Sequence, residues 1–224
     1  MKTVPKVVAF SVIGTAMFLA MLFWPAGTFS YWQAWVFLVV FALSTLIPSL
    51  YLLRTNPAAL ERRMRTGPVA ETRPVQKAVI VVAFLSLVAL IVVSVLDHRY
   101  GWSPVPAAVS LVGDVLVAVG LGISMLVVIQ NGYAASTITV ESGQKLVSTG
   151  LYALVRHPMY TGTIIMMLGV PLALGSYWGL VFVIPGVLGL AVRIGDEEQL
   201  LKQELDGYSE YAQQVHYRLV PYVW

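Results

Sequence analysis

Two segments of the chain carry polar side chains whose types and spacing could hold a charged ligand. In the first, LYALVRHPMYTG, Arg156 and His157 stand directly before Pro158 and an apolar run. Because proline favours the first turn of a helix and disfavours helix in the residue before it, we expect His157 at the N-cap position. The N–H groups of such a helix start, with the positive end of its dipole, can bind a carboxylate or a phosphate. Arg156 and His157 would add donors and Tyr160 a hydroxyl; in the alternative, Arg156 reaches lipid headgroups and His157 only caps the helix.

The second segment, RIGDEEQLL and the residues after it, places two carboxylates beside an apolar run. Arg193 and Glu197 are four residues apart and so share a helix face, in the basic-then-acidic order that supports a helix less well. Glu197 and Glu198 lie within about one helical turn of the expected membrane boundary, where a carboxylate is costly unless a cation faces it. The candidate cations are Arg156, Arg193 and a positively charged cofactor. Apolar and aromatic residues among the following charges predict an amphipathic helix on the cytoplasmic surface: Leu200, Leu201, Leu205, Tyr208 and Tyr211.

The elements that must position these groups follow from an apolar composition. Of the 224 residues, 58% are hydrophobic and 11% charged, and the mean hydropathy of +0.79 is well above that of soluble domains. Stretches of roughly 20 apolar residues match the ~30 Å hydrocarbon core of a bilayer. About six such spans are present: Val7–Trp24, Trp32–Leu53, Ala78–Leu96, Val105–Ile129, Met159–Leu174 and Tyr177–Val192. None shows the period-two alternation of a barrel strand, so we predict an all-α polytopic membrane bundle whose last two spans form a helical hairpin.

The basic residues predict the orientation of this bundle. With six spans, only Arg99 of the 14 lysines and arginines falls on one side of the membrane. The other side carries Lys2, Lys6, Arg54, Arg62, Arg63, Arg65, Arg73, Lys77, Lys145, Arg156, Arg193, Lys202 and Arg218. By the positive-inside rule both termini are expected in the cytoplasm, with the protein in the inner or plasma membrane. The first span is expected to remain uncleaved, since its apolar run is longer than that of a signal peptide.

The sequence divides into an N-terminal four-span region, residues 1–130, and a C-terminal cofactor-binding region, residues 131–224. The basic loop from Arg54 to Lys77 is expected to meet anionic lipid headgroups, and a role in admitting a substrate stays open. Asp114 lies within the fourth span, where a carboxylate is either functional or a buried hydrogen-bonded acid near a substrate cavity. The absence of cysteine excludes thiolate chemistry. Because His98 and His216 are expected on opposite sides of the membrane, we predict no metal site.

Three motifs in the C-terminal region suggest a family. QKLVSTGLYALVRHPMYTG is followed by RIGDEEQLL and then by YSEYAQQVHYRLVP, in an order and spacing that resembles the isoprenylcysteine carboxyl methyltransferase family and the related membrane phospholipid methyltransferases. The resemblance extends from about residue 137 to residue 221 and implies methyl transfer from S-adenosylmethionine. Carried over by motif, it implies that the cofactor is bound by Gln144, Lys145, Leu146, Val147, Tyr152, His157, Pro158, Met159, Tyr160 and Glu197. The eukaryotic members typically have histidine where this chain has Gln144, so the chain departs from the family pattern at this position.

The resemblance further implies that Arg193 binds the substrate, and we regard Arg193 and Glu198 as the candidate catalytic residues. A carboxylate acceptor needs no base, whereas a neutral amine or thiol needs a proton acceptor, for which His157 and Glu198 are candidates. S-adenosylmethionine fits the residues independently, because the helix start at Pro158 could hold its carboxylate and Glu197 its ammonium or ribose hydroxyls. Most of the rate would then come from alignment of donor and acceptor in a dry pocket.

We therefore predict an integral membrane methyltransferase that acts on a lipid-like or small apolar acceptor at the cytoplasmic face. The acceptor is expected to enter from the bilayer, where Pro171 and Pro185 would bend the hairpin helices apart. Membrane lipids are the expected surroundings, and neither nucleic acid nor metal is an expected partner. The alternatives are an NADPH-dependent isoprenoid or steroid reductase, whose cofactor phosphate could use the Arg54–Lys77 loop, and a non-catalytic membrane scaffold. The methyl acceptor, prenylcysteine included, and the oligomeric state stay open.

Overall fold

The computed structural model describes residues 3–64, 73–134, 138–141 and 143–224, which form a helical membrane bundle with no strand among them. The long helices are α1 (Thr3–Ala26), α2 (Trp32–Thr55), α4 (Pro74–Tyr100), α5 (Ala107–Gln130), α6 (Pro158–Ala173) and α7 (Val183–Glu204). Shorter helices are α3 (Pro57–Met64), α8 (Tyr208–Gln214) and the 3₁₀-helices η1 (Gly150–Ala153) and η2 (Trp178–Phe182). The predicted all-α membrane fold is confirmed.

The number of membrane spans differs from the prediction. Among the described residues, four helical segments are long and apolar enough to cross a bilayer: Trp32–Thr55, Pro74–Tyr100, Ala107–Gln130 and Trp178–Glu204. Two further apolar helices are shorter, Val12–Ala26 and Pro158–Ala173. An apolar helix is therefore present at each of the six predicted positions. Only four of these segments are long enough to cross a bilayer, so six complete membrane spans are not confirmed.

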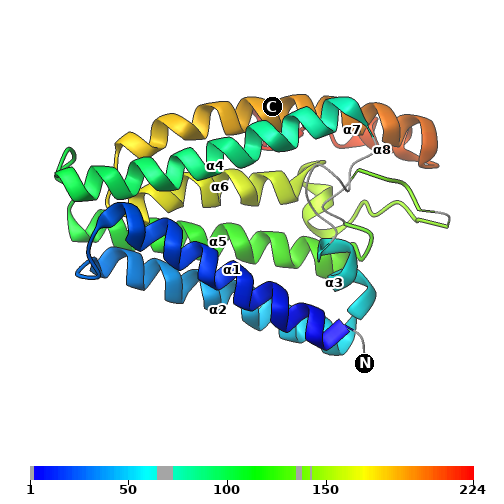
Figure 1. The fold of residues 1–224 in the computed structure, drawn as a ribbon. Coiled ribbons are helices and arrows are strands. Elements are labelled where there is room, and N and C mark those ends of the chain that lie inside the picture. Colours follow the sequence, from blue (N-terminus) through cyan, green and yellow to red (C-terminus); the bar gives the residue numbers. More distant parts are fainter. Residues whose placement is uncertain (1–2, 65–72, 135–137, 142) are drawn as a thin grey trace.

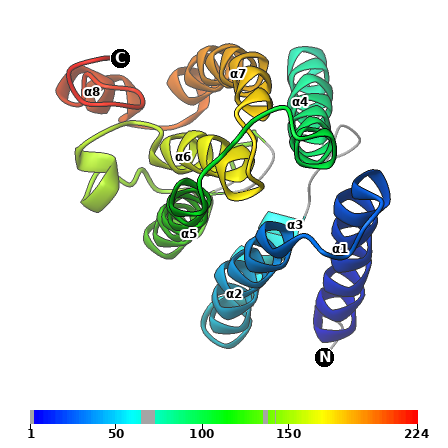
Figure 2. The same ribbon diagram turned by 90° about the vertical axis from the view of Figure 1, so that its left-hand side faces the viewer.

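The six long helices run side by side, and the loops between them alternate between the two ends of the bundle. One end gathers the N-terminal end of α1, the helix α3, the loop after α5, the start of α6 and the helix α8 (Figure 1). Viewed along the helices, α6 lies between α5, α7 and α4, while α1 and α2 cover one side (Figure 2). The two polar segments that carry the predicted site therefore meet at one end of the bundle.

Glycines allow α5 and α6 to approach closely. A Cβ atom added at Gly113 would overlap the backbone N of Ala173, and one at Gly120 would overlap the carbonyl O of Gly162. Close backbone approach at small residues is a major source of helix association in membranes, where burial from water contributes little. This contact holds the start of α6 in place relative to the end of α5.

Substitution of Gly120 by valine is expected to separate these two helices, because the new side chain would occupy the position of the α6 backbone. Overpacking of this kind costs about 1–3 kcal/mol or more. The midpoint of thermal unfolding in detergent should fall clearly. Gly122→Val is the matched control, since a Cβ atom at Gly122 has no neighbour within 4 Å among the described residues. An equal fall in both variants would contradict the packing interpretation.

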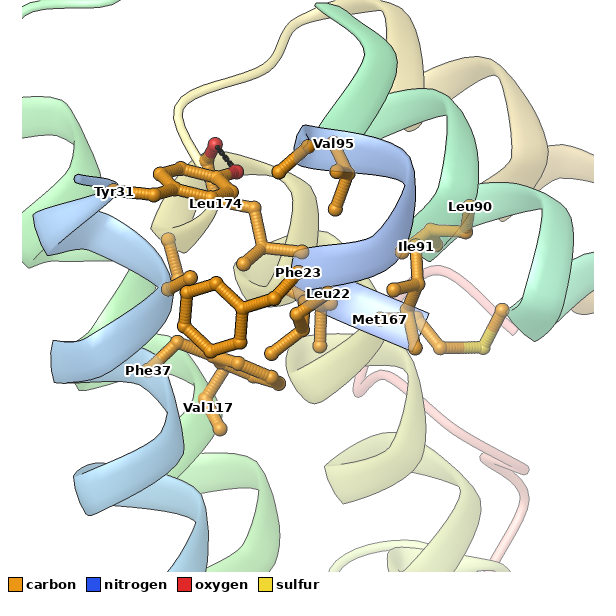
Figure 3. Packing of buried hydrophobic residues seen from close by; sticks show 14 of the residues in the cluster. Leu22, Phe23, Tyr31, Phe37, Leu90, Ile91, Val95, Val117, Met167 and Leu174 are labelled. Atoms are coloured by element: carbon orange, nitrogen blue, oxygen red, sulfur yellow. Dashed lines mark hydrogen bonds between the residues drawn. The ribbon is translucent and has the colours of Figure 1, made fainter. Parts of the chain in front are cut away.

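A compact apolar core lies toward the end of the bundle opposite the polar segments. Phe23 from α1, Phe37 from α2, Ile91 from α4, Val117 from α5 and Met167 from α6 are all buried within it (Figure 3). This core joins the two N-terminal helices to the C-terminal ones, so that the latter form a fixed framework for the site.

The hairpin between α6 and α7 turns where the sequence predicted it. Gly175 has a φ of +71°, and the Ser176 hydroxyl donates to the buried carboxylate of Asp97 over 2.6 Å. Pro171 lies inside α6, as expected. The expectation that Pro185 bends the second hairpin helix is wrong, because α7 begins at Val183 and a proline in the first turn removes no helical hydrogen bond.

Candidate functional site

A cleft opens at the polar end of the bundle, between the loop after α5, the start of α6, the last turns of α7 and the helix α8. Its empty space, including the part open to solvent, is about 850 Å³. All ten residues predicted to bind the cofactor line this cleft: Gln144, Lys145, Leu146, Val147, Tyr152, His157, Pro158, Met159, Tyr160 and Glu197. The structure thus brings the three motifs to one place.

The start of α6 has the geometry that the sequence predicted. His157 is the N-cap residue and Pro158 the first residue of the helix. The His157 carbonyl accepts the N–H groups of Tyr160 and Thr161, at 3.1 and 3.2 Å. Its side chain makes no capping bond and is buried against α7, with Nε2 3.3 Å from Glu198 Oε1 and Nδ1 3.8 Å from Glu197 Oε2. His157 therefore connects the helix start to both carboxylates, which exceeds the role of a simple cap.

Glu198 is the centre of a buried ionic cluster. Arg156 Nε lies 2.8 Å from its Oε1, and Arg218 NH2 lies 3.0 Å from its Oε2. Glu198 is 4% exposed, so its charge depends on these two partners. Glu198 is not among the residues that line the cleft. A carboxylate held by two guanidinium groups is a poor proton acceptor, and this arrangement favours a positioning role for Glu198 over the base that the sequence suggested.

The same cluster fastens the C-terminal segment over the start of α6. The Arg156 backbone N–H donates to the carbonyl of Tyr217 and the His157 backbone N–H to that of Arg218, each over 2.9 Å. The Thr161 hydroxyl donates to the Leu219 carbonyl over 2.7 Å. The sequence indicates only a cytoplasmic charge for Arg218, although this residue lies in the third motif. Its pairing with Glu198 joins that motif to the other two.

Glu197 belongs to a second network that runs into the bundle. The Tyr160 hydroxyl donates to Glu197 Oε2 over 2.6 Å, and Arg193 Nε donates to the Tyr160 hydroxyl over 3.0 Å. Arg193 NH1 also donates to Oε1 of Gln76 over 2.8 Å. Arg193 is buried behind Tyr160 and does not itself line the cleft. The residue predicted to bind the substrate thus lies behind Tyr160 and not at the surface of the cleft.

The helix α8 covers the cleft with tyrosines. The sequence predicted one amphipathic surface helix, but Gly207, with a φ of +80°, separates α8 from α7. Tyr208 and Tyr211 are consequently buried and line the cleft. Burial raises the pKa of both phenols, and of Tyr152, so all three stay protonated. Among the described residues no partner satisfies the buried Tyr208 hydroxyl.

The described part of the predicted basic loop contacts residues that line the cleft. Arg62 on α3 forms two 2.8 Å hydrogen bonds with the carboxylate of Glu141, and its guanidinium lies over the ring of Tyr133, 4.9 Å from the centroid. Arg63 NH1 donates to the sulfur of Met159 over 3.1 Å. Tyr133 and Met159 line the cleft, so α3 supports one of its walls. Residues 65–72 of the predicted loop lie outside the described residues.

Three other predicted positions lie apart from the cleft. Asp114 is buried in the first half of α5, away from the end that carries the site, and neither of its oxygens has a partner among the described residues. The His98 ring stacks on that of Tyr31, with centroids 3.7 Å apart. His216 has no place in the cleft lining. Within the described ranges, no three histidine, aspartate or glutamate side chains are grouped so that they could hold a metal ion.

Comparison with known proteins shows which family the motif region resembles. The family model for phospholipid methyltransferases matches residues 109–205. The predicted resemblance is confirmed for this region. It contains nearly all of α5, the whole of α6 and α7, and with them every residue predicted to bind the cofactor. The helix α8, Arg218 and Gln76 lie outside it.

Individual relatives show the same resemblance over part of their length. Probable protein-S-isoprenylcysteine O-methyltransferases from Oryza sativa subsp. indica and subsp. japonica are each 36% identical over 113 residues, 48% of this chain and 59% of the relative. Delta(14)-sterol reductase from Mus musculus is 32% identical over 93 residues, 39% of this chain and 22% of the relative. The chain thus spans less than two thirds of the curated relatives it matches.

Proposed function

We propose that this protein is an integral membrane methyltransferase that uses S-adenosylmethionine at the cleft between α6, α7 and α8. The observation that carries the proposal is the convergence of all ten motif residues on one cleft. The match of residues 109–205 to phospholipid methyltransferases supports it independently of the geometry.

The cleft offers partners for the ammonium and carboxylate groups of the cofactor. Glu197 Oε2 accepts a hydrogen bond from the Tyr160 hydroxyl. No described residue donates to Oε1, so this second oxygen would accept from the ammonium group. The helix start at Pro158 and the side chain of Lys145 would hold the carboxylate. The Tyr208 hydroxyl supplies one more polar contact, and the apolar wall around Leu201 suits adenosine. The bound cofactor would supply an electrophilic methyl group, so the chain itself has to exclude water and align the acceptor.

The acceptor on this proposal is a lipid-like or small apolar molecule that reaches the cleft from the bilayer. Arg193 lies about one turn deeper in α7 than Glu197, on the bundle side of Tyr160, where its guanidinium would orient a polar headgroup. The network around Glu198 positions the helix start and takes no proton. This division of roles suits an acceptor that is already ionised, which needs no base.

Methyl transfer is tested with the purified full chain in lipid nanodiscs and S-adenosylmethionine labelled in its methyl group. Phosphatidylethanolamine and N-acetyl-S-farnesylcysteine are supplied in separate reactions, because the family match and the relatives point to these two acceptor classes. We expect label in the organic phase with at least one of them. A second candidate function, reduction with NADPH, has the sterol reductase similarity in its favour. Consumption of NADPH with a sterol or isoprenoid, without label transfer, would replace the first proposal by the second.

The proposed function requires the cleft to face the cytoplasm, where S-adenosylmethionine is made. Because the chain contains no cysteine, single cysteines can be introduced at exposed positions on either end. Ser209→Cys on α8 should react with a membrane-impermeant maleimide only after the cells are opened, whereas Tyr100→Cys should react in intact cells. The reverse pattern would place the cleft outside and remove its access to the cofactor.

A further inference from the structure

Gln76 is an unusual residue for the start of an apolar helix. It is the third residue of α4 and is 0% exposed. A buried amide is costly unless its polar atoms are satisfied, and here both are. Oε1 accepts from Arg193 NH1 over 2.8 Å, and Nε2 donates to Asp196 Oδ2 over 2.5 Å. One side chain of α4 thus holds two charged residues of α7 that lie three positions apart.

The direction of each of these hydrogen bonds is determined by chemistry. Arginine only donates and a carboxylate only accepts, so the Gln76 oxygen must face Arg193 and its NH₂ group must face Asp196. The Tyr160 hydroxyl has one proton; because it accepts from Arg193, it gives that proton to Glu197. On the other side of Asp196, Nε and NH2 of Arg73 donate to Oδ1.

We propose that Gln76 is a positioning residue of the cofactor site, acting through Arg193 and Tyr160 on Glu197. It keeps Arg193 in the orientation that directs the Tyr160 proton to one oxygen of Glu197 and leaves the other oxygen for a cationic ligand. This inference rests on the proposed function. It assigns a role in the site to α4, which lies outside the region that matches the family. No motif contains Gln76, and only the folded chain brings it to Arg193.

The proposal is tested by exchanging the amide and the carboxylate between positions 76 and 196. In Gln76→Glu, the new carboxylate can accept from Arg193 but cannot donate to Asp196, so two carboxylates face each other. In Asp196→Asn, the amide cannot satisfy both Gln76 and Arg73. In the double variant, the new amide at position 196 donates to the new carboxylate at position 76, and the amide oxygen accepts from Arg73, which restores each donor–acceptor contact. We expect each single substitution to weaken binding of S-adenosylmethionine about tenfold and the double variant to recover most of this loss.

The measurement is calorimetric titration of the full chain in nanodiscs with S-adenosylmethionine, and in parallel with S-adenosylhomocysteine. The two ligands carry the same ammonium group, so both dissociation constants should change together. Ser94→Ala is the matched control: Ser94 is also 0% exposed on α4, but its hydroxyl donates to the Leu90 carbonyl away from the site. Thermal unfolding of every variant separates folding from binding.

Unchanged affinity in folded Gln76→Glu and Asp196→Asn would overturn this inference and leave the proposed function intact. A double variant as weak as the single ones would also overturn it, because the loss would then be general damage to the bundle. If Gln76→Glu does not fold, the comparison of Asp196→Asn with the double variant gives the same decision. Wild-type protein that binds neither ligand would overturn the proposed function and the role of Gln76 with it.

Discussion

Replacement of Glu198 by glutamine is expected to loosen the end of the bundle that carries the cleft. The amide would leave Arg156, whose side chain is 9% exposed, without its counter-charge. Removal of one partner of a buried ion pair typically costs about 3–5 kcal/mol; we expect the lower part of this range, because the second partner, Arg218, is 35% exposed and partly screened by water. The midpoint of thermal unfolding should fall, and the segment around Arg218 should become sensitive to protease.

The same variant distinguishes the positioning role of Glu198 from the role of a base. A positioning role predicts weaker binding of S-adenosylmethionine, because Arg156 and His157 would no longer be fixed at the helix start. A base would leave that binding unchanged and abolish only turnover. Glu210→Gln is the matched control, since Glu210 is exposed on α8 and forms no ion pair within the described part of the chain. Normal affinity together with lost turnover in Glu198→Gln would restore the role that the sequence suggested.

Glutamine at position 197 is expected to weaken binding of S-adenosylmethionine by about tenfold to a hundredfold. The substitution keeps the size of the side chain but removes the charge that would pair with the ammonium group. Loss of a charge-assisted contact corresponds to about 1.5–3 kcal/mol. Titration calorimetry measures the effect directly. The unfolding temperature should change little, since Glu197 borders the cleft and is only half-buried.

Two comparisons make this second prediction specific. Glu204→Gln removes an exposed carboxylate about two turns further along α7 and should leave the affinity unchanged. Tyr160→Phe removes the hydroxyl that donates to Glu197 but keeps the carboxylate, so a smaller loss is expected. A folded Glu197→Gln variant with the affinity of the wild type would remove Glu197 from the cofactor site.

The sequence predicted the helices and the cleft lining well because both depend on local patterns. A bilayer requires long apolar runs, so hydropathy alone placed α2, α4 and α5. Pro158 marks the start of α6 by its missing N–H, which is a local property. The motifs then supplied ten of the residues that line the cleft, since each motif is a short continuous stretch of the chain.

Other features could not be predicted because they depend on contacts between distant elements. Gln76 is isolated in sequence, and its partners on α7 follow more than a hundred residues later. The pairing of Arg218 with Glu198 requires the chain to fold back after α8. Tyr208 and Tyr211 show the same amphipathic pattern whether they face lipid or a cleft, so only the turn at Gly207 decides their environment. The bend expected at Pro185 was predicted wrongly because the 3₁₀-helix η2 precedes the start of α7, and hydropathy does not distinguish a 3₁₀-helix from an α-helix.

Binding of S-adenosylmethionine in the cleft between α6, α7 and α8, through Glu197 and the helix start at Pro158, is the interaction on which the proposed function depends. Its most direct test is calorimetric titration of the wild-type chain in nanodiscs, first with S-adenosylmethionine and then, on fresh protein, with NADPH. We expect saturable binding of S-adenosylmethionine at one site per chain and no binding of NADPH. Saturable binding of NADPH with no heat from S-adenosylmethionine would contradict this expectation.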